Sequence, residues 1–526
     1  MHSLARRAFL EKAAWAATAT SLPRWAWSNT PAPGSNPFAL GIASGDPTPD
    51  GVVLWTRLIP ADPGAAVNPL TVHLEVADDT AFSRIVQRGQ AQALPEWGHS
   101  VHVELQGLQP DHWYHYRFHH SGATSATGRT RTAPALTDLP ARLRVVFASC
   151  QRWEHGYYAA WRQVVADAPD LVLFLGDYIY EYACPKDISG LARVHSLRAA
   201  QTLADYRDRY ALHKSDPLLQ AAHAACPWSA TWDDHEVQND YAGQLGRDGD
   251  AATFAAMRVA GWQAFYEHMP LRASSLARGV GALQVYRGLS WGRLAQLHLL
   301  DARQFRQWQA CRKPGSSGAG SVRPSDCAAW GDPTRTLLGA EQEQWLDQRL
   351  ADGAAVAGAS DTNAPRWSVI AQQTLFSPRH HPSGKRSTDT WDGYPAARAR
   401  LLQSLQRHPQ RNTVLLGGDI HQNYVSNVLA DPEHAKSPVI ASEFCGTSIS
   451  SRSGTTQDKA DAIARHNPHV LLARCEERGY GLADITPQRW TTTLRVLDDP
   501  LRAESGTHTQ ARFVVEDRVP GPQRDL

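Results

Sequence analysis

The sequence has no stretch of the roughly 18 to 20 uninterrupted apolar residues that a membrane-spanning helix requires, so we expect no transmembrane segment. It also lacks an excess of one charge: 53 Lys and Arg stand against 52 Asp and Glu, which argues against specific nucleic-acid binding. Seven cysteines are too few for a disulfide-dense scaffold. With 42% hydrophobic residues in 526, the chain is instead predicted to be globular and to form about two to four domains.

The first 28 residues are predicted to be an export signal. Arg6 and Arg7 are followed by Phe9 and by a weakly apolar, Ala-rich run, which resembles a twin-arginine signal peptide. Ala26 and Ser28 provide a small-residue cleavage site, and an amphipathic first helix is the alternative. The resemblance implies that the twin-arginine machinery exports the folded protein to the periplasm or the medium.

The cysteines predict one local disulfide. Cys311 and Cys327 bracket a loop rich in Gly, Ser and Pro, and a bridge there would restrain a long irregular segment. Because the number of cysteines is odd, at least one thiol stays unpaired in a monomer. We expect Cys150 to be unpaired, because it ends an apolar strand beside other metal-binding residue types.

Residues 36–135 are predicted to form a small β-sandwich. Short segments with alternating apolar residues occur at 51–58, 70–77, 102–108 and 113–118, and Gly, Pro, Asp or Asn bound them. Period-two alternation at this spacing is typical of immunoglobulin or fibronectin type III domains.

Residues 140–515 have an α/β pattern. Continuous apolar runs predict buried strands, and they alternate with segments of helical periodicity. The strands are expected within 143–150, 170–177, 293–301, 366–373 and 412–420. The helices are expected at about 156–167, 196–213, 251–268, 340–351 and 395–407.

Residues that can bind metal ions follow several of these strands. They are Cys150, Asp177 and Tyr180, then the group Asp233, Asp234, His235, Glu236 and Asn239, and finally Asp419 and His421. Ligands of open α/β sheets collect at the carboxyl ends of the strands, so these segments can converge. Each residue alone has an ordinary explanation as a turn cap or a packing residue. Four such segments in one domain favour a site.

The residue types indicate two different cations. Thiolate, phenolate, carboxylate and imidazole together suit Fe³⁺, whereas the remaining carboxylates and the amide oxygen suit Ca²⁺, Mn²⁺ or Mg²⁺. Two cations bridged by a carboxylate can hold a phosphoryl oxygen and a metal-bound hydroxide for in-line attack. Asp177 is the natural bridge.

Motifs along nearly the whole chain resemble the PhoD-type alkaline phosphatase/phosphodiesterases, which have the calcineurin-like metallophosphoesterase fold. They include F-A-S-C-Q, L-G-D-Y-I-Y-E, T-W-D-D-H-E-V-Q-N-D-Y, L-L-D-A-R-Q-F-R, L-G-G-D-I-H-Q-N and S-E-F-C-G-T-S-I-S-S. The resemblance implies a β-sheet sandwich flanked by helices after the small β-sandwich. It also implies hydrolysis of phosphate mono- and diesters at alkaline pH, outside the cytoplasm.

The same resemblance implies roles for individual residues. The Fe³⁺ ligands would be Cys150, Asp177, Tyr180 and His421. The ligands of Ca²⁺, with Mn²⁺, Mg²⁺ or Zn²⁺ as alternatives, would be Asp177, Asp234, Asn239 and Asp419. In the wider pattern an Asn precedes the motif His, but here Asp234 does, so either Asp234 or Asn239 is the direct ligand.

Two further residues are candidates for catalysis. By the same pattern His235 contacts the phosphate and can protonate the leaving oxygen, which suits an imidazole that titrates near neutrality. Arg303 either contacts the phosphate or pairs with Asp301 or another carboxylate.

The residues alone do not exclude two other classes of function. One is a surface-binding protein with a degenerate enzyme domain. The other is a bimetallic hydrolase that acts on amides or lactones, whose sites favour several His ligands rather than a thiolate and a Tyr. The preferred phosphate ester and the oligomeric state do not follow from the sequence.

Overall fold

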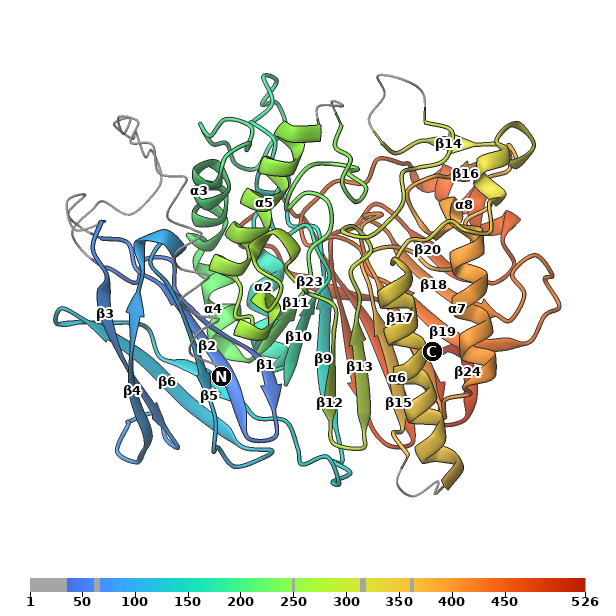
Figure 1. Ribbon diagram of the computed structural model, residues 1–526. Helices are drawn as coiled ribbons and strands as arrows, with labels where there is room; N and C mark the ends of the chain where they lie inside the picture. Colours follow the sequence, from blue (N-terminus) through green and yellow to red (C-terminus); the bar gives the residue numbers. More distant parts are fainter. Residues whose placement is uncertain (1–35, 61–66, 248–250, 313–317, 360–363, 526) are drawn as a thin grey trace.

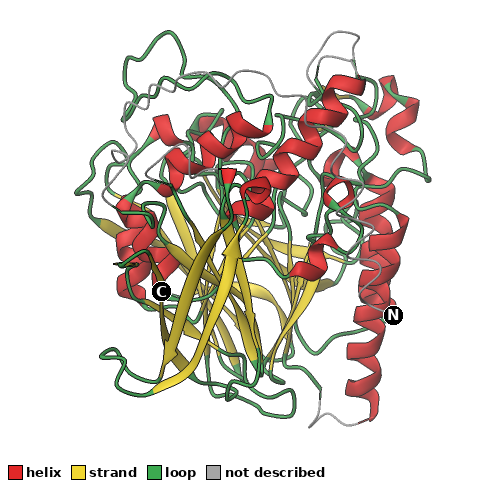
Figure 2. Ribbon diagram, turned by 60° about the vertical axis from the view of Figure 1, so that its left-hand side comes forward, coloured by secondary structure: helices red, strands yellow, loops and turns green. Residues whose placement is uncertain are grey.

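Two large β-sheets face each other at the centre of the protein, and helices cover their outer sides (Figures 1 and 2). The computed structural model describes residues 36–60, 67–247, 251–312, 318–359 and 364–525. The predicted signal peptide, 1–28, lies outside these ranges. Apolar side chains of both sheets, such as Phe147, Val369 and Leu416, form the core between the two layers. The four-layer arrangement confirms the expected sheet sandwich with flanking helices.

The first sheet has ten strands. Their order across the sheet is β24 (Val519–Arg524), β23 (Thr507–Glu516), β22 (Arg489–Leu497), β21 (Gly479–Ile485), β9 (Leu143–Ala148), β10 (Leu171–Phe174), β11 (Trp228–Ala230), β1 (Ile42–Thr48), β2 (Gly51–Arg57) and β5 (Ser100–Leu105). Strands β9, β10 and β11 run parallel to one another. Their almost uninterrupted apolar sequences are explained by burial on both faces.

The second sheet has seven strands. Their order is β12 (Arg287–Trp291), β13 (Ala295–Leu299), β15 (Trp367–Ala371), β17 (Thr413–Gly417), β19 (Val439–Cys445), β18 (Asn423–Leu429) and β20 (Val470–Arg474). A separate pair joins β14 (Ser321–Val322) to β16 (Arg386–Ser387). Strands β13, β15, β17 and β19 are parallel, so their carboxyl ends meet at one edge of the sheet.

Each sheet has its own helical cover. The ten-stranded sheet packs against α2 (Ala159–Asp167), α3 (Leu203–Lys214), α4 (Pro217–Ala225) and α5 (Ala251–His268). The seven-stranded sheet packs against α6 (Ala340–Ala359) and α7 (Pro395–Arg407), and α8 (Gln457–His466) lies beside β20.

The predicted helices agree with the structure except at three ends. Helix α2 starts at Ala159 rather than at 156. Helix α3 starts at Leu203 rather than at 196, because Thr202 and Asp205 form a reciprocal capping box that fixes the first turn there. Helix α6 continues to Ala359 rather than ending at 351, since its Ala-rich sequence has high helix propensity.

The N-terminal β-sandwich shares a sheet with the rest of the protein. One layer consists of β4 (Ile85–Ala93), β3 (Leu70–Ala77), β6 (Trp113–His120), β7 (Ala123–Thr124) and β8 (Gly128–Arg131). The other layer is β1, β2 and β5, and β1 pairs with β11 at Gly45 and Trp228. The ten-stranded sheet therefore crosses the boundary between the proposed domains 36–135 and 140–515.

The predicted disulfide between Cys311 and Cys327 is confirmed. Cys150 is unpaired and buried, as expected. Within the described ranges, no helix combines the length and the hydropathy of a membrane span.

Candidate metal centre

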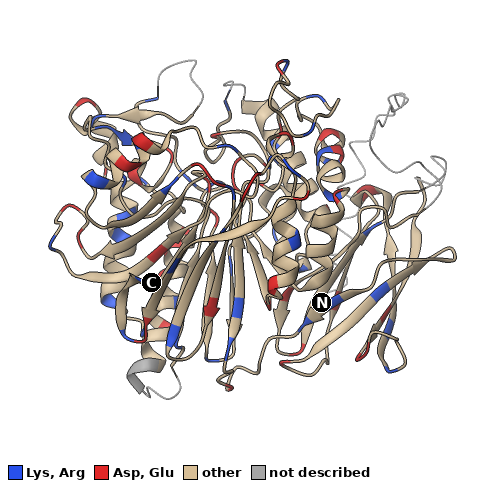
Figure 3. Ribbon diagram, turned by 180° about the vertical axis from the view of Figure 1, so that it is seen from behind, with Lys and Arg blue, Asp and Glu red and all other residues tan. Residues whose placement is uncertain are grey.

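The predicted ligands follow four strands, three of them in one sheet. Cys150, Asp177 and Asp234 come shortly after the parallel strands β9, β10 and β11, and His421 comes after β17 of the facing sheet. Several acidic segments meet in the loops above the two sheets (Figure 3). The site therefore lies at the carboxyl ends of strands from both sheets.

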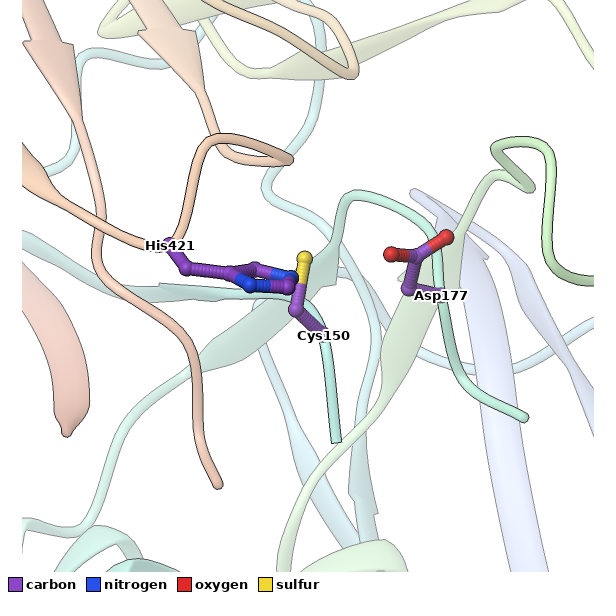
Figure 4. Close-up of side chains that lie close together, drawn as sticks. All are labelled: Cys150, Asp177 and His421. Carbon is purple, nitrogen blue, oxygen red and sulfur yellow. The ribbon is translucent and has the colours of Figure 1, made fainter. Parts of the chain in front are cut away.

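Cys150, Asp177, Tyr180 and His421 converge on one point. The ligand atoms of Cys150, Asp177 and His421 lie within 4.8 Å of one another, although three separate segments carry them (Figure 4). The Tyr180 hydroxyl donates to Asp177 Oδ2 (2.9 Å) and lies 3.1 Å from His421 Nε2. His421 Nδ1 donates to the carbonyl of Arg452 (2.7 Å), so Nε2 keeps its lone pair toward the cluster.

A second group shares Asp177. Ligand atoms of Asp177, Asp234 and His235 also lie within 4.8 Å of one another. Asp177 Oδ1 and Asp234 Oδ1 are buried and have no hydrogen-bond partner. Buried carboxylate oxygens without a donor are costly unless a cation compensates them. The residues present thus fit two cations joined by the Asp177 carboxylate.

The backbone at four of the predicted ligands is strained. Cys150, Asp177, Asp419 and His421 have φ values of 59°, 58°, 67° and 55°, in the left-handed region that L-residues rarely adopt. Such conformations cost on the order of 1 kcal/mol or more each, and they cluster at functional sites. Gly176 allows the close approach of two ligand loops, because a Cβ there would lie 2.5 Å from the Asp233 Cβ.

Glu236 holds two of the ligand loops together. Its buried carboxylate accepts hydrogen bonds from the backbone N–H groups of Asp177 (3.1 Å), Tyr178 (2.7 Å) and Asp233 (2.9 Å). These bonds compensate the amides of the strained turn after β10. Glu236 therefore positions the carboxylate of Asp177, the predicted bridge, and its own oxygens are occupied by these N–H groups.

Burial disfavours the negatively charged forms of the acidic groups in the cluster. Burial, together with the nearby Asp177, raises the pKa of both the Cys150 thiol and the Tyr180 phenol well above their usual values. Burial also raises the pKa of Asp177, and Asp234 and Asp233 add to this effect. A cation reverses this balance, since metal ligands bind as thiolate, phenolate and carboxylate and release their protons.

His235 is oriented by Glu181. Glu181 Oε2 lies 2.7 Å from His235 Nδ1, and Glu181 Oε1 accepts from the backbone N–H of Asn239 (2.9 Å). The His235 ring packs against the Tyr180 ring, with the centroids 4.1 Å apart. Burial alone would lower the pKa of His235, but the charges of Asp177 and Glu181 raise it well above its ordinary value.

Arg303 is fully buried among carboxylates. Its Nε donates to Asp233 Oδ1 (2.5 Å), and its Nη1 and Nη2 each donate to an oxygen of Asp389 (2.8 Å). Asp234 Oδ2 lies 3.6 Å from Nη2. Of the two alternatives for Arg303, these contacts favour ion pairs over phosphate contact. The partners are Asp233 and Asp389 rather than Asp301.

Asn239 and Asp419 belong to neither of the two groups, although the segments that carry them lie nearby. The N–H of Asp240 donates to Asp234 Oδ2 (2.7 Å), so the Asp234 carboxylate contacts the turn that carries Asn239. Asp419 Oδ2 accepts from the Thr374 hydroxyl (2.7 Å), and burial followed by the charge of Asp389 raises its pKa to about 7. Their roles as ligands stay predictions.

The fold and this donor cluster define a class, the PhoD-like phosphatases. The chain belongs to this family: the model of the PhoD-like phosphatase domain matches residues 145–494, and that of the family's N-terminal domain matches residues 24–134. Among individual proteins, the chain is 42% identical to alkaline phosphatase D of Bacillus subtilis (strain 168) over 494 residues. The match covers 92% of this chain and 81% of that protein. A solved structure of PhoD is 41% identical, with a TM-score of 0.85, over 94% of this chain and 92% of that one.

Two residues beside the predicted ligands, Glu181 and Asp389, were not predicted from the sequence. Glu181 ends the motif G-D-Y-I-Y-E directly after Tyr180, so its position was a usable signal. Asp389, the bidentate partner of Arg303, follows the short strand β16 and carries no such signal.

Proposed function

We propose that this phosphatase is a metal-dependent alkaline phosphatase/phosphodiesterase that hydrolyses phosphate mono- or diesters outside the cytoplasm. The observation that carries the proposal is the convergence of thiol, phenol, carboxylate and imidazole on one buried point, with Asp177 shared by a second acidic group. Its similarity to alkaline phosphatase D of Bacillus subtilis supports the same activity.

The donor atoms suit two unlike cations. Cys150, Asp177, Tyr180 and His421 would hold Fe³⁺, since thiolate and phenolate favour a ferric centre. Asp177 and Asp234, with Asn239 and Asp419, would hold Ca²⁺, with Mn²⁺, Mg²⁺ or Zn²⁺ as alternatives. When bound, the cations supply positive charge for the phosphoryl oxygens and activate the attacking water.

His235 is the proposed proton donor to the leaving oxygen. Glu181 engages Nδ1 and the Tyr180 ring limits rotation of the imidazole, so Nε2 is the nitrogen that meets the substrate. We propose that Arg303 acts on the reaction indirectly. Its charge compensates Asp233 and Asp389 and so keeps the turn before His235 in place.

Metal analysis combined with a substrate panel tests the proposal. Protein purified without chelators should contain iron and a second cation, show a visible band that disappears on reduction, and hydrolyse phosphate esters. A colourless protein that contains zinc and cleaves amides or lactones would instead support the other bimetallic class. A metal-free protein without hydrolytic activity would support the surface-binding alternative.

Export is tested separately. Replacing Arg6 and Arg7 by Lys should leave uncleaved protein in the cytoplasm, because the twin-arginine machinery reads the arginine pair. A mature form that still begins near Asn29 would mean that another route exports the protein.

A further inference from the structure

Arg152 lies on the same pair of tyrosines as the proposed proton donor. Its guanidinium carbon is 5.7 Å from the ring centroid of Tyr180 and 5.2 Å from that of Tyr182. The His235 ring contacts the same two rings, at centroid distances of 4.1 and 5.2 Å. Arg152 and His235 therefore contact the same aromatic pair, which places the guanidinium group close to the proposed proton donor.

Two other guanidinium groups near the centre, those of Arg303 and Arg478, are already engaged. Arg303 donates to Asp233 and Asp389, and it is completely buried. Arg478 is 3% exposed and donates to the Ser448 hydroxyl (3.0 Å) and to backbone carbonyls. Neither residue has a donor directed to solvent, so neither is suited to bind a substrate group.

Arg152 differs in exposure and in the quality of its contacts. Its side chain is 17% exposed, and its two hydrogen bonds to Glu154 are long, at 3.4 and 3.5 Å. The Glu154 carboxylate also contacts His195 Nε2 (3.3 Å), so Glu154 is not paired with Arg152 alone. Among the described residues, none accepts a hydrogen bond from Nη1 of Arg152. The backbone around it is fixed, because its N–H donates to the Ser451 hydroxyl (3.1 Å).

A second arginine adds positive charge to this edge of the site. The backbone N–H of Arg452 donates to His155 Nδ1 (3.1 Å). Burial, followed by the charges of Arg152 and Arg452, lowers the pKa of His155 to about 4. Both guanidinium groups therefore lie close enough to His155 to disfavour its protonated form. His155 and Arg452 also line a cavity of about 400 Å³, together with Ser450 and Thr455.

We propose that Arg152 binds a second anionic group, carried by the leaving alcohol of the substrate. The proposal rests on the proposed function, in which the cations bind the reacting phosphoryl group and His235 protonates the alcohol. The planar donor edge of Arg152 suits a phosphate or carboxylate, which accepts two parallel hydrogen bonds. The preferred substrates are then phosphate esters whose alcohol carries another phosphate or carboxylate.

A matched pair of substrates tests this. We compare 3-hydroxypropyl phosphate with 1,3-propanediol bisphosphate, whose leaving alcohols differ only in the second phosphate. In Arg152→Gln, kcat/KM for the bisphosphate should fall on the order of 10-fold or more, the effect of losing one charge-assisted hydrogen bond. The fall for the simple ester should be clearly smaller. Arg152→Lys should keep part of the preference, because it keeps the charge.

Controls separate this role from a structural one. Arg162→Gln on α2 removes the same charge from an exposed pair with Glu504, and it should leave the ratio of the two kcat/KM values unchanged. Iron content and the visible band should stay at wild-type levels in Arg152→Gln. Equal proportional losses on both esters, or loss of iron, would overturn the proposal. A wild-type protein that is inactive on both esters would contradict the proposed function itself.

Discussion

Removal of the His235 imidazole should affect substrates according to their leaving groups. An alkyl ester needs a proton on the departing oxygen, whereas an activated aryl ester departs without much protonation. We expect His235→Ala to lose on the order of 10²- to 10⁴-fold in kcat/KM on alkyl esters, and distinctly less on activated aryl esters. Both metals should be retained, because His235 is not one of the proposed ligands.

The contact between Glu181 and His235 predicts how much activity a substitution of Glu181 should cost. Glu181 Oε2 is 2.7 Å from His235 Nδ1 in a buried setting, and a hydrogen bond to a charged group contributes about 1.5 to 3 kcal/mol. Glu181→Gln should therefore cost roughly 10- to 150-fold on alkyl esters. Because Glu181 acts through His235, the double variant should be little slower than His235→Ala alone.

The assay measures kcat/KM for one alkyl and one aryl ester, together with metal content. His466→Ala, an exposed histidine in the last turn of α8, is the matched control and should behave like the wild type. Equal proportional losses on the two esters at full metal occupancy would show that His235 only contacts the phosphate. Loss of a metal would show that it is a ligand. Either result refutes the role in proton transfer.

Three other substitutions test the centre and its surroundings. Asp177→Asn should abolish activity and lower the content of both metals, since an amide cannot compensate two cations; near-normal metal content and rate would remove Asp177 from the bridge. Cys150→Ser should lose iron and the visible band. As a control, Cys226→Ser changes a buried free cysteine outside the cluster and should keep both. An unchanged spectrum in Cys150→Ser would contradict the assignment of Cys150 as a thiolate ligand. Cys311→Ser should lower the free energy of unfolding by about 3 kcal/mol in denaturant titrations, given the separation of 16 residues, and an unchanged midpoint would refute this.

The sequence predicted the convergence of the ligands because it follows from local rules. Cys150 and Asp177 each follow a buried parallel strand, and such strands bring their carboxyl ends together. The ion pair between Arg303 and Asp389 could not be predicted, since it joins two irregular segments 86 residues apart. The left-handed backbone conformation of His421 could not be predicted either, because a residue other than glycine gives no sequence signal for a positive φ.

The shared sheet has a consequence for the order in which the chain can fold. Strand β9, which begins at Leu143, can pair with β21 only after residues near 480 have been synthesised, and β1 can pair with β11 only after residues near 228. The two edge strands of the sheet, β5 and β24, come from opposite ends of the chain. Pairings between such distant segments are slow to form, and they leave strand edges open during synthesis. The nascent chain cannot complete its largest sheet until its last strands leave the ribosome. The predicted twin-arginine route, which carries folded proteins, is compatible with this order of folding.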